Sequence, residues 1–361
     1  MDLLAVHDGL APDVWKLRDS MDKEPLISIL TPAYNQGQYI EQTIQSVLSQ
    51  TYENWEWIII DDGSTDATRD IIGSYKDERI RCYRQRHGGI DSICSTHNKA
   101  LGLSKGDFIA LIDGDDLWPG YKLERQLKSF RSGTAVLSYG ECCLIDSEGG
   151  KIDYITTPQD RGTSGNDPVG SSLPELLLTA NSFIYNPTVL IRSSSLKRIG
   201  GFVSCRGLAH DFPTWCRLSL EGTFRPVRSC LGFWRRHPSS LIFSNAEYRF
   251  RNKIPFVKDF LELHEKKIES LGISLTKDDS YPRIDMRLKS FIEHFSYDRA
   301  MLLARMGMFE EAKEEFGKYK ENNSSLKNTV IDYLFSLSQS VRRDFVNPAR
   351  RLKEKMSARR P

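Results

Sequence analysis

From Leu26 onward the sequence alternates short apolar segments with segments in which apolar residues recur at helical spacing. The short segments 27–30, 57–60, 80–83 and 108–112 have the length and composition of buried strands. Between them, apolar residues lie three and four positions apart, which is typical of helices. Such alternation builds a parallel sheet with helices on its faces, so we predict an α/β domain with a mainly parallel central sheet.

Further elements are predicted up to about residue 244. They are a helix at 123–130, a strand at 135–137, a helix at 173–179, a strand at 188–191, a short helix near Leu196, a helix at 212–220 and extended segments over 224–236. Residues 146–171 are rich in Gly, Ser, Thr, Asp and Pro and predict a long surface loop.

Strand signals end near residue 245, and the remaining sequence predicts helices. We therefore divide the chain into an N-terminal arm (1–24), a nucleotide-binding α/β domain (25–244) and a helical C-terminal region with a basic tail (245–361). Within the last region, residues 296–320 resemble one helical hairpin of the tetratricopeptide kind. A single such unit cannot bury its own apolar face, so it should pack on the α/β domain or on a partner.

Charge is unevenly distributed along the chain. The net charge is +2, yet residues 341–361 hold eight Lys or Arg against Asp344 and Glu354, a local excess of +6 that leaves about −4 elsewhere. A nucleic-acid-binding body usually has a broad basic face, so no nucleic-acid partner is predicted. The tail could lie against anionic lipid or be a solvated basic end, and Pro348 interrupts any continuous amphipathic helix there.

The cysteines and the N-terminus indicate where the protein resides. The seven cysteines are odd in number and form no C-x-x-C pair, which favours a reducing compartment. Asp2, His7 and Asp8 lie where a signal peptide would need a basic and then an apolar run, and no apolar stretch approaches about 18 residues. We predict a cytoplasmic protein, with any membrane contact peripheral and at the inner face.

Polar and acidic residues follow three of the predicted strands. The first strand ends in 31–35, the second in 61–64 and the fourth in 113–116. Open α/β sheets bind ligands at the carboxyl ends of their strands, so these loops should meet at one site. The last loop holds Asp113, Asp115 and Asp116, and such crowding of like charges is unfavourable unless a cation or basic partner lies there. A divalent ion bound by one or two carboxylates and substrate phosphates fits that need.

An isolated D-x-D is more often a solvated acidic turn, but five motifs in order make a more specific pattern. They are PAYN at 32–35, IIIDDGSTD at 58–66, FIALIDGDD at 108–116, HD at 210–211 and RRH at 235–237. Over about residues 26–240 the chain thereby resembles the inverting glycosyltransferases of family 2. The resemblance implies a GT-A type nucleotide-binding fold and transfer of a sugar from a nucleoside diphosphate.

The resemblance also implies a nucleotide-sugar site near the first two strands. Tyr34 would stack near the nucleobase, and Asp62 would bind the base. The neighbours Pro32, Ala33 and Asn35 would shape the same pocket.

By the same resemblance, the remaining motifs hold a cation and the catalytic base. Asp113 would reach the ribose or the waters of the metal, Asp115 would ligate Mn²⁺ or Mg²⁺, and His237 would contact the metal or the phosphate. Asp211 would be the general base. Family members commonly have Glu before this Asp, whereas this chain has His210, which is better suited to tuning the site than to acting as the base.

Other residues near the predicted site have two interpretations each. Residues 88–89 and 98–99 could run beneath the donor, or form a turn and a helix surface. Trp118 and Trp215 could stack on sugar rings or belong to the core, with the core favoured for Trp215. Arg235, in the RRH motif, favours an anionic ligand nearby.

The predicted function is inverting transfer from a nucleotide sugar, most simply a UDP-sugar, to a hydroxyl group of a saccharide or lipid-linked acceptor. Two alternatives stay open: a non-catalytic sugar-nucleotide-binding or scaffold protein, and a sugar nucleotidyltransferase. The second is disfavoured because no glycine-rich basic loop follows the first strand. Walker A and dinucleotide-binding fingerprints are absent from the sequence.

Overall fold

The structure is a computed structural model. It describes residues 24–89, 92–130, 134–157, 168–178, 183–203, 210–237, 240, 252–273, 275, 286, 300–301, 303–304 and 308–320. The predicted N-terminal arm up to residue 23 and the basic tail lie outside the described residues.

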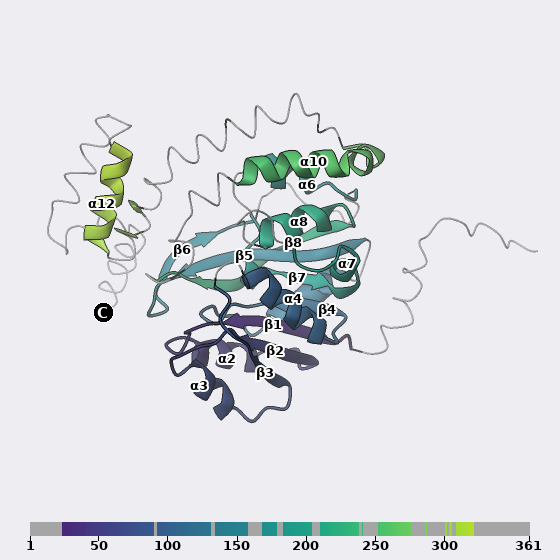
Figure 1. Ribbon diagram of the computed structural model, residues 1–361. Helices are drawn as coiled ribbons and strands as arrows, with labels where there is room; N and C mark the ends of the chain where they lie inside the picture. Colours follow the sequence, from purple (N-terminus) through teal and green to yellow (C-terminus); the bar gives the residue numbers. More distant parts are fainter. Residues whose placement is uncertain are drawn as a thin grey trace, which may run out of the picture.

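One mixed sheet of eight strands forms the framework of the α/β domain (Figure 1). The strands are β1 (Ile27–Ala33), β2 (Trp55–Asp61), β3 (Ile80–Arg84), β4 (Phe108–Leu111), β5 (Ala135–Ile145), β6 (Lys151–Ile155), β7 (Leu190–Arg192) and β8 (Thr223–Arg235). Their order is β3-β2-β1-β4-β7-β5-β6, and β8 pairs with β5. The pairs β3–β2, β2–β1, β1–β4 and β5–β8 are parallel, so the predicted mainly parallel α/β sheet is confirmed.

The parallel strands β1, β2 and β4 form because their residues are covered on both faces of the sheet, whereas β3 lies at the edge and has no buried residue. Every residue of β4 is buried, and β2 is buried except at Glu56. Strands covered on both faces read as continuous apolar runs, as these do. In register, Ala33 of β1 lies opposite Asp61 of β2, which places the ends of both strands at one edge of the sheet.

Helices cover both faces of the sheet. They are α2 (Ile40–Leu48), α3 (Thr68–Ser74), α4 (Ile93–Leu103), α5 (Lys122–Leu127), α6 (Leu173–Leu178), α7 (Ser193–Arg198), α8 (Asp211–Ser219) and α10 (Lys253–Ser270), with short 3₁₀ turns η2 (Lys128–Phe130) and η3 (Asn186–Thr188). Helix α2 buries Ile40, Ile44 and Val47, the positions that its apolar spacing predicted.

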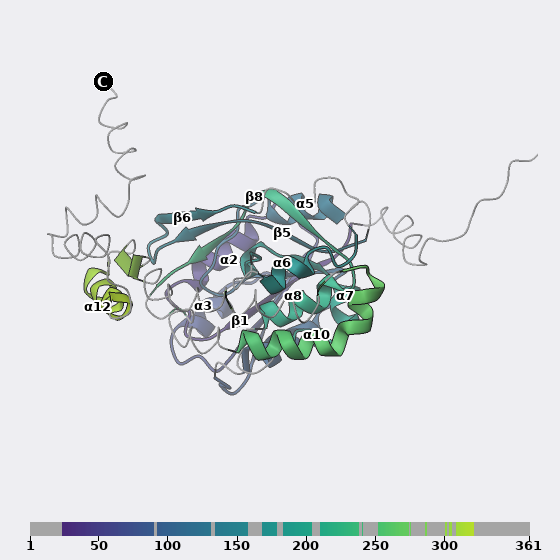
Figure 2. The ribbon, with the colours of Figure 1, turned by 90° about the horizontal axis from the view of Figure 1, so that it is seen from above.

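Two hydrophobic clusters result, one on each face. Residues of α2, α3 and α5 pack in one cluster, and residues of α4, α6, α8 and α10 pack in the other. In the view from above, α5 and α10 lie on opposite sides of β5 (Figure 2). Helix α10 thus shares the core of the α/β domain, although it begins beyond residue 245.

The predicted loop at 146–171 is wrong over its first part. Strand β5 continues to Ile145, and β6 pairs with it as an antiparallel hairpin. The turn between them is held by Asp146, whose Oδ1 accepts hydrogen bonds from the backbone N–H of Glu148 and Gly150. The polar composition concealed the strand, because β6 is short and none of its residues is buried.

In the C-terminal region, helix α12 (Phe309–Lys320) packs with residues near 300. Ala300, Leu303 and Ala304 share a small apolar cluster with Phe309, Ala312 and Phe316. The described residues 300–301, 303–304 and 309–320 of the predicted hairpin are helical, whereas residues 305–307, which would connect its helices, lie outside the described residues.

Two further observations concern the described residues as a set. None of their helices is long and apolar enough to cross a membrane. Their cysteines Cys82, Cys94, Cys142, Cys143, Cys216 and Cys230 have free thiols.

Candidate functional site

The three polar loops meet at one edge of the sheet. Strand β1 lies between β2 and β4 and is parallel to both, so residues 34–35, Asp62 and 113–116 follow three adjacent carboxyl ends. The loops are also bonded to each other: the backbone N–H of Asp62 donates to Ala33 O at 2.8 Å, and Thr31 Oγ1 donates to Ile112 O at 2.7 Å. The sequence order alone therefore gathers the predicted nucleotide and metal residues.

Asp62 is buried and held by three donors. Gln85 Nε2 donates to Oδ1 at 2.6 Å, His87 Nδ1 lies 2.8 Å from Oδ2, and the backbone N–H of Gly88 donates to Oδ2 at 3.3 Å. The His87 ring also stacks on Tyr34, with ring centroids 3.8 Å apart and planes inclined by 13°. The imidazole of His87 thus stacks on Tyr34 and contacts the carboxylate of Asp62, the two contacts that were predicted for the nucleobase of the donor.

The residues around Tyr34 support the loop mainly through the backbone. Asn35 has φ = +51°, and its side-chain oxygen accepts from the Thr65 N–H at 2.9 Å, which ties the β1 loop to the β2 loop. Pro32 and Ala33 belong to β1 itself, and Ala33 is buried. Tyr34 keeps 40% of its surface exposed, so its ring is accessible to a ligand.

The acids of the β4 loop differ in their surroundings. Burial, followed by the charges of Asp115 and Asp211, raises the pKa of Asp113 to about 7, and a hydrogen bond from Asn186 opposes the shift. Three carboxylates from two distant segments therefore repel one another across a short distance. A bound cation would relieve this repulsion.

His237 reaches the same group of acids from the end of β8. Its Nε2 lies 2.9 Å from Asp115 Oδ2, and its ring lies 4.7 Å from that of Tyr39. A carboxylate and an imidazole are suitable ligands for Mn²⁺. Among the described residues, no three His, Cys, Asp or Glu side chains form a ready ligand set. A cation here would thus use few protein ligands and depend on phosphate oxygens for the rest.

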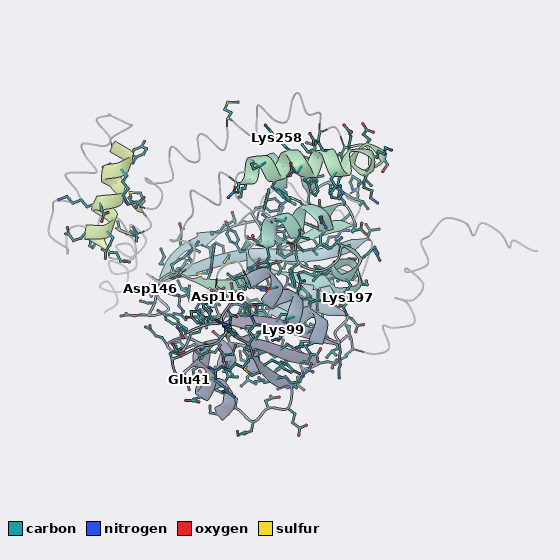
Figure 3. All side chains as sticks on the ribbon, in the orientation of Figure 1. Glu41, Lys99, Asp116, Asp146, Lys197 and Lys258 are labelled. Carbon is teal, nitrogen blue, oxygen red and sulfur yellow. The ribbon has the colours of Figure 1, made fainter. Side chains whose placement is uncertain are left out.

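Asp116 is a structural acid. It is fully buried, and its Oδ1 accepts the backbone N–H of Arg235 at 2.9 Å. Burial and the neighbouring carboxylates of Asp115 and Asp113 hold its pKa well above the usual range. Figure 3 shows Asp116 in the interior of the molecule and Lys258 at its periphery. The bond to Arg235 fixes the acidic turn to the end of β8.

Arg235 is also structural, which corrects the anion-binding role that the RRH motif favoured. Its guanidinium donates to Asp115 O at 2.8 Å, to Asp146 O and Ser147 O at 3.1 Å and to Gln42 Oε1 at 2.8 Å. All its nitrogens are therefore engaged by the protein. The side chain clamps the acidic turn to the β5–β6 turn.

The predicted base lies at the first residue of α8. Asp211 is half-buried, its Oδ1 accepts the Phe212 N–H at 2.7 Å, and its charge acts on Asp113. From α10, Lys253 also reaches it: burial lowers the pKa of Lys253 to about 8, and the charge of Asp211 opposes the shift. The structure thus brings Asp211 to the acids of the β4 loop from more than 90 residues away.

His210, which stands where the family commonly has Glu, is packed as an apolar residue. It is 4% exposed, its ring lies 4.0 Å from that of His97, and neither of its ring nitrogens has a hydrogen-bond partner in the part of the chain that the structure describes. Burial lowers its pKa to about 4. It is therefore neutral at physiological pH and supports Asp211 by packing.

This burial predicts a pH-dependent stability. The unfolded chain binds a proton at His210 below about pH 6.5, whereas the folded chain resists doing so until about pH 4. The free energy of unfolding should therefore fall as the pH falls through this window, by up to about 3 kcal/mol from His210. Urea unfolding at pH 7.5, 6.0 and 4.5 would measure it. His210→Gln should show a correspondingly weaker pH dependence, and equal slopes for both proteins would contradict this account.

The two tryptophans are core residues. Trp118 is 3% exposed, and its Nε1 donates to Pro187 O at 2.7 Å, while Trp215 is fully buried. Stacking on a sugar ring is therefore excluded for both. Asn98 is likewise structural, because its side chain bonds both backbone groups of Phe202.

Several site residues were not predicted from the sequence. His87, Gln85 and Asn186 contact the predicted acids directly, and Lys99 Nζ donates to Gln85 Oε1 at 3.1 Å. Of these, only Lys99 had been considered, as a residue beneath the donor. The others lie outside the periodic elements, so hydrophobic spacing gave no signal for them.

Comparison with known proteins gives a consistent set of relatives. The profile described as "Glycosyl transferase family 2" matches residues 28–200. TuaG of Bacillus subtilis (strain 168), described as a teichuronic acid biosynthesis glycosyltransferase, is 40% identical over 250 residues, which cover 68% of this chain and 92% of TuaG. Escherichia coli WfaP, a UDP-Glc:alpha-D-GlcNAc-diphosphoundecaprenol beta-1,3-glucosyltransferase, is 41% identical over 114 residues, which cover 32% of this chain and 45% of WfaP.

Solved structures agree on the fold. Residues 1–349 of S. aureus TarS, in complex with UDP-GlcNAc, superpose with a TM-score of 0.53 at 16% identity, covering 91% of this chain and 92% of that TarS fragment. The Pyrobaculum calidifontis mannosyltransferase PcManGT, in complex with GDP-Man and Mn²⁺, gives 0.50 at 14% identity, covering 88% of this chain and 84% of PcManGT. At these identities the similarity establishes the GT-A-like fold.

Proposed function

Because the chain belongs to glycosyl transferase family 2, and is thus an enzyme that transfers a sugar from a nucleotide sugar, we propose that its donor is a UDP-sugar and that transfer inverts the anomeric carbon. The acceptor in this proposal is a hydroxyl group of a saccharide or lipid-linked glycan. The name of WfaP supports the UDP-sugar donor and the lipid-linked acceptor. The name of TuaG, which refers to teichuronic acid biosynthesis, supports a saccharide acceptor. A cytoplasmic location, with any membrane contact peripheral and through the basic tail, stays a prediction.

One observation carries the proposal: Asp211 lies in electrostatic contact with Asp113, and Asp113 with Asp115, at the sheet edge that also holds Asp62. The proposed nucleoside and diphosphate positions thus follow adjacent strand ends, and the charge of the proposed base, at the start of α8, acts on Asp113 there. A donor laid across them would present its anomeric carbon near Asp211.

The donor nucleoside would bind at the β1 and β2 loops. Tyr34 would stack on the base, and Asp62 would accept its N–H. Since His87 already holds Asp62 Oδ2, at 2.8 Å, base binding requires that ring to leave the carboxylate. Asn35, Pro32 and Ala33 would define the shape of this part of the site.

Asp115 and His237 would hold Mn²⁺ or Mg²⁺, with Asp113 contacting the ribose or the metal's waters. When bound, the ion offsets the charge that develops on the leaving diphosphate. Asp211 takes the proton of the acceptor hydroxyl. The hydroxyl oxygen forms a bond to the anomeric carbon as the bond from that carbon to the β-phosphate oxygen breaks, and UDP leaves.

A panel of nucleotide sugars assayed for the released product tests this function. With Mn²⁺ and a saccharide or lipid-linked acceptor, or slowly with water, we expect UDP to be released and the release to stop in EDTA. Release of pyrophosphate instead would favour a nucleotidyltransferase. Donor binding without any release would favour the non-catalytic alternative, which no feature of the described site supports.

A further inference from the structure

The side chain of Arg236 is a buried cation with unused donors. It is 5% exposed, and its Nε and Nη1 have no hydrogen-bond partner. The guanidinium of the adjacent Arg235, by contrast, donates hydrogen bonds to protein oxygens. Buried charges are unfavourable unless paired, so the site around Arg236 lacks a group that the described residues do not supply.

The surroundings of Arg236 contain further unsatisfied atoms. Its guanidinium lies 3.4 Å from the ring centroid of half-buried Trp234, and the charges of Asp116 and Asp115 act on it. Asp116 Oδ2 and Asn186 Oδ1 are buried and also lack partners. Asn186 belongs to this neighbourhood because it bonds Asp113 and follows Tyr185, whose hydroxyl also interacts with Arg236.

The position of Arg236 in the sheet separates it from the nucleoside. It follows β8, which pairs with β5, whereas Tyr34 and Asp62 follow β1 and β2. Strands β4 and β7 lie between these two parts of the sheet. If the base of the donor lies at β1 and its diphosphate lies at Asp115, the sugar of the donor would reach Arg236. Alternatively, the acceptor would lie against Arg236.

The unsatisfied atoms define the chemistry of the missing group. Arg236 needs an anionic acceptor, and a planar guanidinium matches a carboxylate well. Asn186 Oδ1 needs a donor, which a hydroxyl group supplies. A deprotonated phosphate offers only acceptors. A neutral hexose offers hydroxyls without a full charge. A sugar acid offers both.

We propose that Arg236, together with Asn186, forms a subsite for the carboxylate and hydroxyl groups of a hexuronic acid carried by the donor or the acceptor. The inference rests on the proposed function, since it assigns a substrate class to the same site.

Two matched pairs of probes test the subsite and identify the source of the acid. The first is UDP-glucuronate against UDP-glucose with Mn²⁺, for the donor. The second is methyl β-D-glucuronide against methyl β-D-glucoside with saturating UDP and Mn²⁺, for the acceptor. The wild type should bind the acidic member of one pair about 10- to 100-fold more tightly. Arg236→Gln should abolish that preference, and Arg236→Lys should keep part of it.

Arg69→Gln, at an exposed arginine of α3, is the matched control and should leave the preference unchanged. Melting temperatures establish that each variant is folded. No acid preference in either pair, or an Arg236→Gln variant that keeps it, would overturn the subsite. Equal weakening of UDP alone would also overturn it, by assigning Arg236 to the diphosphate. If the wild type binds no UDP with Mn²⁺, the proposed function fails instead.

Discussion

Replacing Asp211 by Asn is expected to lower kcat about 10²- to 10⁴-fold, the range typical for loss of a general base. Asparagine keeps the size of the side chain and can still accept the Phe212 N–H that Asp211 accepts at 2.7 Å. It cannot take the proton of the acceptor hydroxyl. Initial rates of UDP release at saturating donor and acceptor would measure the loss.

A measurement of donor binding distinguishes the loss of the general base from a structural effect of the substitution. The Kd of the nucleotide sugar should change little in Asp211→Asn, because the proposed role of Asp211 is to accept a proton from the acceptor. Asp70→Asn, at an exposed position of α3, serves as the control and should keep full activity. Transfer that survives in Asp211→Asn would show that another group accepts the proton.

Replacing Asp115 by Asn is expected to lower activity about 10²- to 10³-fold at saturating Mn²⁺, because charge stabilisation by a metal contributes several kcal/mol to the transition state. The change removes the charge that faces His237 Nε2 at 2.9 Å. The variant should also lose the rise in melting temperature that Mn²⁺ and UDP together give the wild type. Thermal melts with each ligand alone and with both would measure it.

Asp116→Asn provides the contrast. Asp116 is fully buried and bonds the Arg235 N–H, so its replacement should lower the melting temperature while the requirement for metal persists. If Asp116→Asn removes the Mn²⁺ response and Asp115→Asn keeps it, the roles of the two acids are reversed.

The fold was predictable where local pattern and burial agree. β1, β2 and β4 are mainly apolar, buried runs, and the parallel pairing of β1 to β4 follows from the helices between them. Strand β6 was not predictable, because its residues are polar or half-buried and it is defined by pairing with Cys142–Ile145. The sheet order also depends on β7, a three-residue strand that inserts between β4 and β5.

The site was predictable as far as it follows from strand ends. The acids of the β2 and β4 loops lie where an α/β sheet binds ligands, so sequence order locates them. The directions in which individual side chains point did not follow from the order of the strands in the sequence. Arg235 and Arg236 are neighbours, but the guanidinium of Arg235 clamps the acidic turn, whereas Nε and Nη1 of Arg236 have no hydrogen-bond partner among the described residues. That difference depends on the register of β8 against β5, which is irregular between Gly140 and Cys142.

His87 illustrates the same limit. Its contacts with Tyr34 and with Asp62 join residues from three loops, and they depend on the path of a short segment after β3. No periodicity marks that segment. The signal available was its position after a strand of the parallel sheet, next to two glycines.

Calorimetric titration of UDP into the wild-type protein, with Mn²⁺ and then with EDTA, tests most directly whether these acids hold a cation against a diphosphate. We expect binding with Mn²⁺ to be about tenfold tighter or more, since Asp113 and Asp115 would otherwise repel the phosphates. The same Kd in Mn²⁺ and in EDTA would contradict the account.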